Sequence, residues 1–105
     1  MKTSEFVSQA RDEIHMGGWT QGAYRNTEGV CVIGALDRVA MRNLQNGGIQ
    51  AHKPAQAALL EKAREMFPGT IAHSIPGYND ASGRTKQDTL DMFDKTIIGL
   101  EERGL

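Results

Sequence analysis

The chain has 105 residues, which is enough for one domain with a modest hydrophobic core. Hydrophobic residues make up 39% of it and charged residues 24%, proportions typical of a globular protein and not of a disordered segment. The net charge is −1, from 12 basic and 13 acidic residues, so composition offers no long-range attraction for nucleic acid or for an anionic membrane. We expect a single domain over residues 1–105.

The single cysteine, Cys31, cannot form an internal disulfide, which favours a reducing compartment. Residues 1–14 turn polar and acidic at once, unlike the apolar stretch of a signal peptide. No run approaches the roughly 18 apolar residues that a membrane-spanning helix needs. These features predict a cytoplasmic protein without a membrane span.

The first segment with helical periodicity is residues 3–16. Its apolar side chains form one stripe, made of Phe6, Val7, Ala10 and Ile14. Thr3 or Ser4 is the predicted N-cap, and Gly17 and Gly18 end the helix because glycine favours the left-handed conformation found there.

A second helix is predicted from about residue 29 to about residue 44. The β-branched run from Val30 to Ile33 is equally compatible with a short strand that pairs with residues 19–24. Gly34 lies inside the predicted helix, where it costs about 1 kcal/mol relative to alanine, so we expect a close helix crossing at this position.

Two further helices follow. Residues 45–53 are predicted to form a turn, and Pro54 to open a helix that Pro68 and Gly69 end. Before Pro76 the pattern allows one short helical turn. Thr85 is the predicted cap of the last helix and forms a capping-box-like pair with Asp88. The apolar spacing of that helix is the clearest in the chain and comprises Leu90, Phe93, Ile97 and Leu100.

This pattern predicts an all-α fold, a compact bundle of four helices, with a small β-hairpin allowed between the first two. Helices in bundles with short loops usually alternate in direction. The first connection, residues 17–29, and the third, residues 68–84, then emerge at the same end. These two connections contain most of the unusual side chains of the chain.

Several short motifs taken in order resemble a family of small uncharacterised proteins from actinobacteria and their phages. The usual form is Gly-Trp-x-Gln-Gly, then Cys-x-x-Gly-Ala, Trp-Asn-Asp and Arg-Thr. The matching positions are Gly18, Trp19, Gln21, Gly22, Cys31, Gly34, Ala35, Asn79, Asp80, Arg84 and Thr85. Tyr78 replaces the usual tryptophan, and Pro76-Gly77 replaces residues that favour a helix. The resemblance spans residues 6–97 and implies no known activity.

Seven residues of the two connections are predicted to line one binding surface: Trp19, Gln21, Tyr24, Tyr78, Asn79, Asp80 and Arg84. Aromatic rings would supply contact area, while the amides and an Asp–Arg pair would fix orientation. The alternative is structural. In that case Trp19 plugs the end of the bundle, Asn79 and Asp80 hold turns, and Arg84 pairs with Asp80 or with helix carbonyls.

Catalysis is the competing hypothesis. Cys31 near a helix start, followed by His73 and Asn79, has the residue order of papain-like cysteine hydrolases, with Gln21 as the oxyanion donor. The apolar neighbours of Cys31 favour an inert buried thiol instead. A second version uses Asp80 as a general base beside Gln21 and Arg84. The histidines His15, His52 and His73 show no metal-ligand spacing, so no metal or cofactor is predicted.

The sequence therefore favours a small non-enzymatic interaction module that binds a cellular protein through the loop surface at one end of the bundle. The alternatives are a small enzyme using Cys31 and His73, or a protein that binds a small ligand. A homodimer is expected, with a seam at Ile98 and Leu100. Nucleic-acid binding ranks third and would need Arg25, Arg38, Arg42 and Arg84 on one surface.

Overall fold

The structure, a computed structural model, describes residues 1–69 and 74–105. Within those ranges it has four longer helices, α1 (Thr3–Gly17), α2 (Val32–Arg42), α3 (Gly48–Met66) and α5 (Lys86–Glu102). Shorter elements are a hairpin of β1 (Arg25–Asn26) and β2 (Gly29–Val30), the 3-10 helix η1 (Leu44–Asn46) and helix α4 (Ile75–Asn79). In these ranges no helix has both the length and the apolar content to cross a bilayer.

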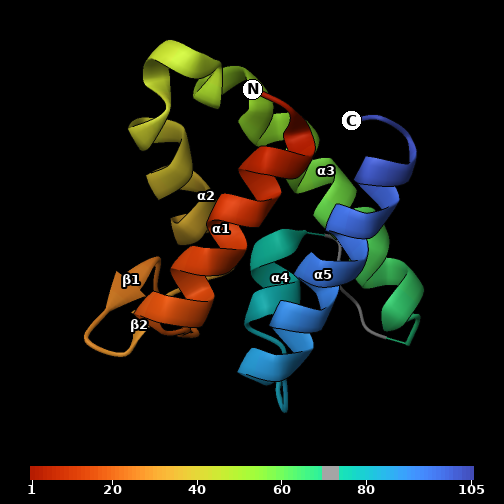
Figure 1. Cartoon of the computed structure of the whole chain (residues 1–105). Coiled ribbons are helices and arrows are strands. Elements are labelled where there is room, and N and C mark those ends of the chain that lie inside the picture. Colours follow the sequence, from red (N-terminus) through yellow and green to blue (C-terminus); the bar gives the residue numbers. More distant parts are fainter. Residues whose placement is uncertain (70–73) are drawn as a thin grey trace.

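Helix α1 lies at the centre of the bundle and contacts α2, α3 and α5 (Figure 1). The predicted stripe is confirmed, because its four side chains are fully buried. They meet apolar side chains from the surrounding helices, including Leu36, Val39, Leu59, Met92 and Phe93. Burial of this apolar surface is the main force that holds the helices together.

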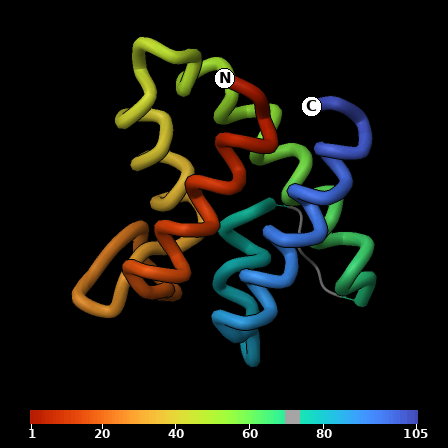
Figure 2. Tube along the Cα trace, viewed as in Figure 1, coloured from red at the N-terminus to blue at the C-terminus, as the bar shows by residue number. Residues whose placement is uncertain are grey.

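The four longer helices alternate in direction, which places the two long connections at one end (Figure 2). The hairpin and α4 lie at that end, while η1 and both termini lie at the other. The terminal ammonium group of Met1 donates to the Asn46 carbonyl at 2.8 Å, and the Ser4 N–H donates to the Leu105 carbonyl at 3.2 Å. The topology predicted from the sequence is confirmed.

The run from Val30 to Ile33 is divided between a strand and a helix. Val30 ends β2, which pairs antiparallel with β1, and Trp19 adds a parallel bridge to Val30. Helix α2 begins only at Val32 and ends at Arg42, so the predicted helix was too long at both ends. The strand interpretation thus holds for Val30 alone, whose main partner is β1 and not residues 19–24 apart from the bridge to Trp19, and the helix interpretation holds for Val32 and Ile33.

The other wrong predictions of helix boundaries came from the rules for proline and for N-cap residues. Helix α3 begins at Gly48 and contains Pro54, whose exposed ring costs one backbone hydrogen bond without ending the helix. Helix α4 contains Pro76 in its first turn, where the missing N–H is not needed, and Ser74 caps it through Gly77 N–H at 3.2 Å. Lys2 precedes α1 and makes no side-chain cap, so the predicted caps at Thr3 or Ser4 were wrong.

Gly34 has a close neighbour, but it is not another helix. A Cβ atom at Gly34 would lie 2.1 Å from the backbone oxygen of Tyr24, and one at Gly18 would lie 2.1 Å from that of Glu28. Gly18 also has a φ of +94°, which side chains rarely adopt. These glycines let the hairpin backbone pack directly against the start of α2 and the end of α1.

Replacing Gly34 by alanine is expected to lower the free energy of unfolding by about 2 kcal/mol or more, because the new methyl group must displace the Tyr24 carbonyl. Urea denaturation measures this change. Gly99→Ala in α5 is the matched control, since a Cβ there meets no atom within 4 Å. It is expected to stabilise the protein by about 0.5–1 kcal/mol through helix propensity. Equal effects of the two substitutions would contradict the packing at Gly34.

Candidate functional site

The side-chain amide of Asn79 joins three segments of the chain. Its Oδ1 accepts hydrogen bonds from the Trp19 indole N–H at 2.8 Å and from the Val32 N–H at 3.1 Å. Its Nδ2 donates to the Thr20 carbonyl at 3.0 Å and to Asp80 Oδ1 at 2.9 Å. The Asn79 side chain is buried, and two donors and two lone pairs are all that an amide offers. The hydrogen-bonding capacity of Asn79 is therefore used inside the protein.

Two exposed side chains extend this contact. Gln21 Nε2 donates to the carbonyls of Asn79 at 3.0 Å and Ala81 at 3.1 Å, and Asp80 Oδ1 accepts from the Gly22 N–H at 3.0 Å. We call this contact between residues 19–22 and residues 78–81 the loop joint. It connects stretches some 58 to 60 positions apart in the sequence.

Arg84 packs between aromatic rings and does not pair with Asp80. Its guanidinium carbon lies 4.2 Å from the ring centre of Phe67 and 4.1 Å from that of Tyr78. The Arg84 Nε–H donates to the Tyr78 carbonyl at 3.1 Å, and its buried Nη2 has no hydrogen-bond partner among the described residues. Contact with two ring faces provides cation–π stabilisation of the guanidinium.

Tyr78 is fully buried under this arginine, and its hydroxyl donates to the Asp88 carbonyl at 3.2 Å. Burial disfavours the phenolate and raises the pKa of Tyr78 to about 12, although the positive charge of Arg84 acts in the opposite direction. The contacts of Tyr78 with Arg84 and Asp88 therefore hold the 78–81 side of the loop joint in place. The predicted capping box of Thr85 and Asp88 is confirmed.

The seven predicted site residues lie at the same end of the bundle but differ in accessibility. Tyr78, Asn79 and Arg84 are buried, Trp19 is half-buried, and Gln21 and Asp80 are exposed but hydrogen-bonded within the joint. Tyr24 is 66% exposed. Most of the polar atoms proposed for ligand contact therefore hold the two loops together, as the structural alternative expects. Arg84 departs from that alternative, because it packs on Phe67 and Tyr78 and does not pair with Asp80. A binding role for the exposed members stays a prediction.

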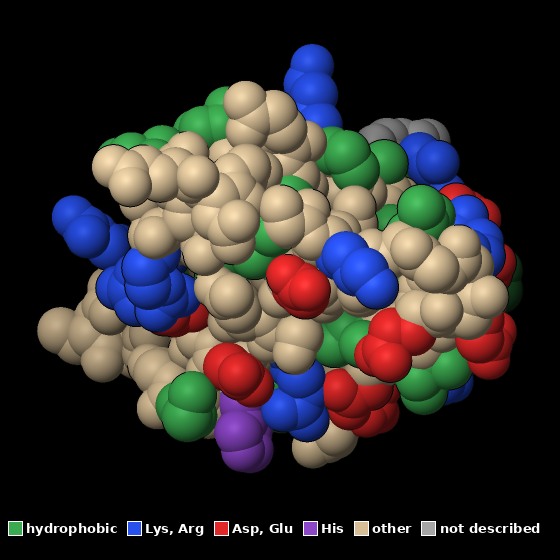
Figure 3. All heavy atoms as spheres, turned by 45° about the horizontal axis from the view of Figure 1, so that its top comes forward, with side chains coloured by type: hydrophobic (Ala, Val, Ile, Leu, Met, Phe, Trp, Pro, Cys, Tyr) green, Lys and Arg blue, Asp and Glu red, His purple; other side chains and the backbone are tan. Residues whose placement is uncertain are grey.

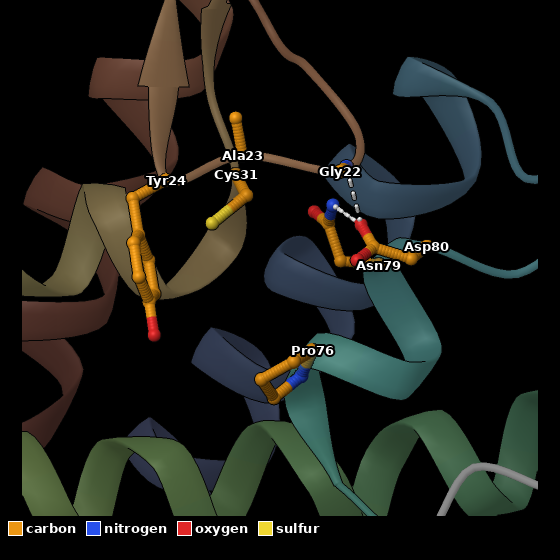
Figure 4. Close-up of a pocket in the computed structure, with 7 residues that line it drawn as sticks. All are labelled: Gly22, Ala23, Tyr24, Cys31, Pro76, Asn79 and Asp80. Atoms are coloured by element: carbon orange, nitrogen blue, oxygen red, sulfur yellow. Dashed lines mark hydrogen bonds between the residues drawn. The ribbon is translucent and has the colours of Figure 1, made fainter.

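A pocket of about 240 Å³ lies between the hairpin and α4 (Figure 4). Its lining residues are Gly22, Ala23, Tyr24, Cys31, Pro76, Asn79 and Asp80. Tyr24 borders one side and Pro76 another, and the sulfur of Cys31 points into the space between Tyr24 and Asn79. The sequence interpretation did not include Gly22, Ala23 and Pro76 in the site, and Pro76 could have been suspected because it departs from the pattern of similar proteins.

Cys31 caps α2: its sulfur accepts a hydrogen bond from the Gly34 N–H at 3.3 Å. Cys31 is buried, as the inert-thiol interpretation expects. The proposed partner His73 lies outside the described residues, so that pairing stays a prediction. Elsewhere, His52 belongs to α3 and bonds Asp37 at 2.7 Å, and no cluster of three or more metal-ligating side chains occurs in the described parts of the chain.

Two other surfaces were considered from the sequence, a basic stripe of four arginines and a dimer seam, and the structure differs from both. Arg38 and Arg42 both pair with Glu13, whereas Arg84 is buried, so the four arginines do not form one basic stripe. The face in Figure 3 shows positive and negative side chains intermixed. The seam at Ile98 and Leu100 is wrong in part, because Leu100 belongs to the core and Ile98 is exposed.

Asn79→Ala is expected to lower the free energy of unfolding by about 3 kcal/mol, because it leaves the buried donors of Trp19 and Val32 without an acceptor. Denaturation by urea, followed by circular dichroism, provides the measurement. Asn46→Ala removes an exposed amide in η1 and is expected to change stability by less than about 0.5 kcal/mol. A loss below about 1 kcal/mol for Asn79→Ala would show that the joint contributes little.

The raised pKa of Tyr78 predicts that the folded protein loses stability in alkaline solution. Because its pKa is about 12 in the folded protein and 10.0 in the reference state, the unfolded chain loses the proton first. The contribution of the protonated Tyr78 hydroxyl to the free energy of unfolding is complete below pH 10 and is lost as the pH rises toward 12. Tyr78→Phe should therefore be less sensitive than the wild type over this range in denaturant titrations. Equal pH dependence of the two proteins would contradict the raised pKa.

Comparison with known proteins places the chain in a family but assigns no activity to it. No curated protein and no solved structure matches the chain. The model of a family of unknown function, DUF6197, matches residues 1–98, which is nearly the whole sequence. The chain therefore belongs to the DUF6197 family.

Proposed function

We propose that the protein is a non-enzymatic interaction module that binds a cellular protein at the end of the bundle formed by the loop joint. The contact surface is the exposed rim of the pocket. It comprises the exposed lining residues Ala23, Tyr24, Pro76 and Asp80, together with the exposed Gln21, which precedes the lining residue Gly22, and we call it the pocket rim.

The observation that carries this proposal is that Tyr24 is an exposed aromatic residue on a fixed backbone. Tyr24 is 66% exposed, and its hydroxyl makes no hydrogen bond with any described residue. The backbone below the ring is nevertheless fixed, because the Tyr24 carbonyl accepts the Cys31 N–H at 3.1 Å and packs against Gly34. An aromatic ring on a rigid backbone loses little entropy when a partner covers it, and tyrosine is enriched among residues that dominate interfaces.

The size of the pocket supports a protein partner over an enclosed small molecule. Small-molecule sites usually measure about 300–1,000 Å³. The pocket beside Tyr24 has about 240 Å³ and is open to solvent at the exposed residues of its rim. This space suits one side chain of a partner, with Tyr24 and Pro76 as apolar walls and Asp80 as a polar edge.

The enzymatic alternative has less support from the same residues. The sulfur of Cys31 accepts a hydrogen bond that caps α2, and Asp80 Oδ1 accepts hydrogen bonds from Gly22 and Asn79. These interactions give both side chains a structural role. A hydrolase that uses Cys31 with His73, and a binding site for a small ligand, remain the alternative proposals.

Three finer statements belong to the proposal. An actinobacterial or phage type of protein is inferred from the motif resemblance, and a cytoplasmic location from the single cysteine. The proposal includes a homodimer, of whose predicted seam Ile98 is exposed and Leu100 is buried.

The test compares Tyr24→Ala with Ile49→Ala, a control that removes a similarly exposed apolar side chain from α3. Each protein and the wild type are immobilised and incubated with lysate of the source cell, and the retained proteins are quantified by mass spectrometry. We expect a protein that the wild type and Ile49→Ala retain equally and that Tyr24→Ala retains about tenfold less, the effect of about 1.4 kcal/mol.

The melting temperatures of the three proteins must agree for this comparison, as expected for substitutions of exposed side chains. Equal recovery on Tyr24→Ala and the wild type, or no specifically retained protein, would contradict the proposed function.

A further inference from the structure

A second depression lies on the other side of Tyr24. It has about 460 Å³ and is lined by Tyr24, Arg25, Val30, Gly34, Asp37, Arg38 and Met41. Gly34, Arg38 and Met41 are spaced four and three residues apart, so they share one face of α2. Gly34 has no side chain and Val30 is buried, so we assign them to the floor. We call this depression the α2 groove.

The groove carries two large apolar side chains in contact with water. Tyr24 is 66% exposed and Met41 is 65% exposed. Single exposed apolar side chains are ordinary on protein surfaces, but two that border one depression are typical of a recognition site. Methionine adapts its shape to different partners, which makes it common in grooves that bind helices or extended segments.

The charges around the groove favour a negatively charged occupant. Arg25 pairs with no carboxylate in residues 1–69 and 74–105, and Arg38 shares the Glu13 carboxylate with Arg42. Asp37 is engaged by His52 at 2.7 Å. The lining residues thus include two guanidinium groups and one carboxylate, an excess of one positive charge on a protein whose net charge is −1.

From this combination we propose that the α2 groove binds a short segment of a partner protein that has large apolar side chains flanked by Asp or Glu. The apolar side chains would pack on Met41 and Tyr24, while the carboxylate would pair with Arg25 and the exposed edge of Arg38. The inference rests on the proposed function, because Tyr24 belongs to both the pocket rim and the groove. It adds the chemistry of the partner and a second contact site.

A second copy of the chain is a less suitable occupant. The end of α5 does combine exposed Ile98 and Leu105 with Glu101 and Glu102. The backbone of that segment is held in its own molecule, however, because the Leu105 N–H donates to the Leu100 carbonyl at 2.9 Å and the Leu105 carbonyl accepts from the Ser4 N–H at 3.2 Å. It is therefore not free to enter the groove as a flexible peptide.

The experiment selects peptides directly on the purified protein. A yeast-displayed library of random peptides, each about twelve residues long, is enriched against the wild type. Enriched peptides are then synthesised, and their affinities are measured by fluorescence anisotropy. We expect Asp or Glu beside Leu, Ile, Phe, Trp or Met, and binding that is at least about tenfold weaker to Arg25→Glu and to Met41→Ser.

Arg64→Glu is the matched control, because it reverses the charge of an exposed arginine on α3 and should change affinity less than about twofold. Arg25→Lys keeps the charge and should retain most of the binding. Absence of an acidic bias, failure to enrich any peptide, or equal binding to Arg25→Glu and the wild type would overturn the inference.

The variants also separate this inference from the proposed function. Peptides that lose affinity on Tyr24→Ala but bind Arg25→Glu and Met41→Ser normally would overturn the groove and leave the pocket rim standing. Sedimentation of the wild type completes the test. Self-association that Met41→Ser abolishes would identify a second copy as the occupant and overturn the partner segment.

Discussion

The arrangement of the two long loops at one end of the bundle depends on one buried side-chain amide. Asn79 accepts from the indole of Trp19 and from the first N–H of α2, and it donates to the Thr20 carbonyl and to Asp80. Amide hydrogen bonds in a low-dielectric interior are costly to leave unmade, so the four partners fix one another. The position of the hairpin, and with it the direction of the Tyr24 ring, follows from this interaction.

The same hydrogen bonds determine which side chains at this end are available to contact a partner. Hydrogen bonds within the loop joint occupy polar atoms of Asn79, Gln21 and Asp80, and the guanidinium of Arg84 is covered by two rings. Exposed apolar side chains then become the main candidates for recognition. Tyr24 stands between a pocket at the joint and a groove along α2, and both belong to the surface that the joint holds in place. A rigid scaffold that presents loops is a common basis for binding.

The sequence predicted features that depend on neighbouring residues. The stripe of α1 and the capping box at Thr85 and Asp88 are local patterns, and alternation of helices was enough to bring the two loops together. Errors arose where distant contacts override local rules, as at Pro54 inside α3. The hydrogen bond between Asn79 and Trp19 was not predicted, because the two residues lie 60 positions apart in the sequence. The close neighbour of Gly34 is likewise a backbone oxygen from another element.

Hydrogen exchange at the Val32 amide tests the central role of Asn79 most directly. An N–H in the first turn of a helix has no acceptor within that helix and normally exchanges rapidly. Here the Val32 N–H donates to Asn79 Oδ1 at 3.1 Å in a buried position. The account predicts that this amide exchanges only on global unfolding, with the protection of the buried α1 residue Ala10. Exchange orders of magnitude faster than at Ala10, as at an uncapped helix start, would contradict it.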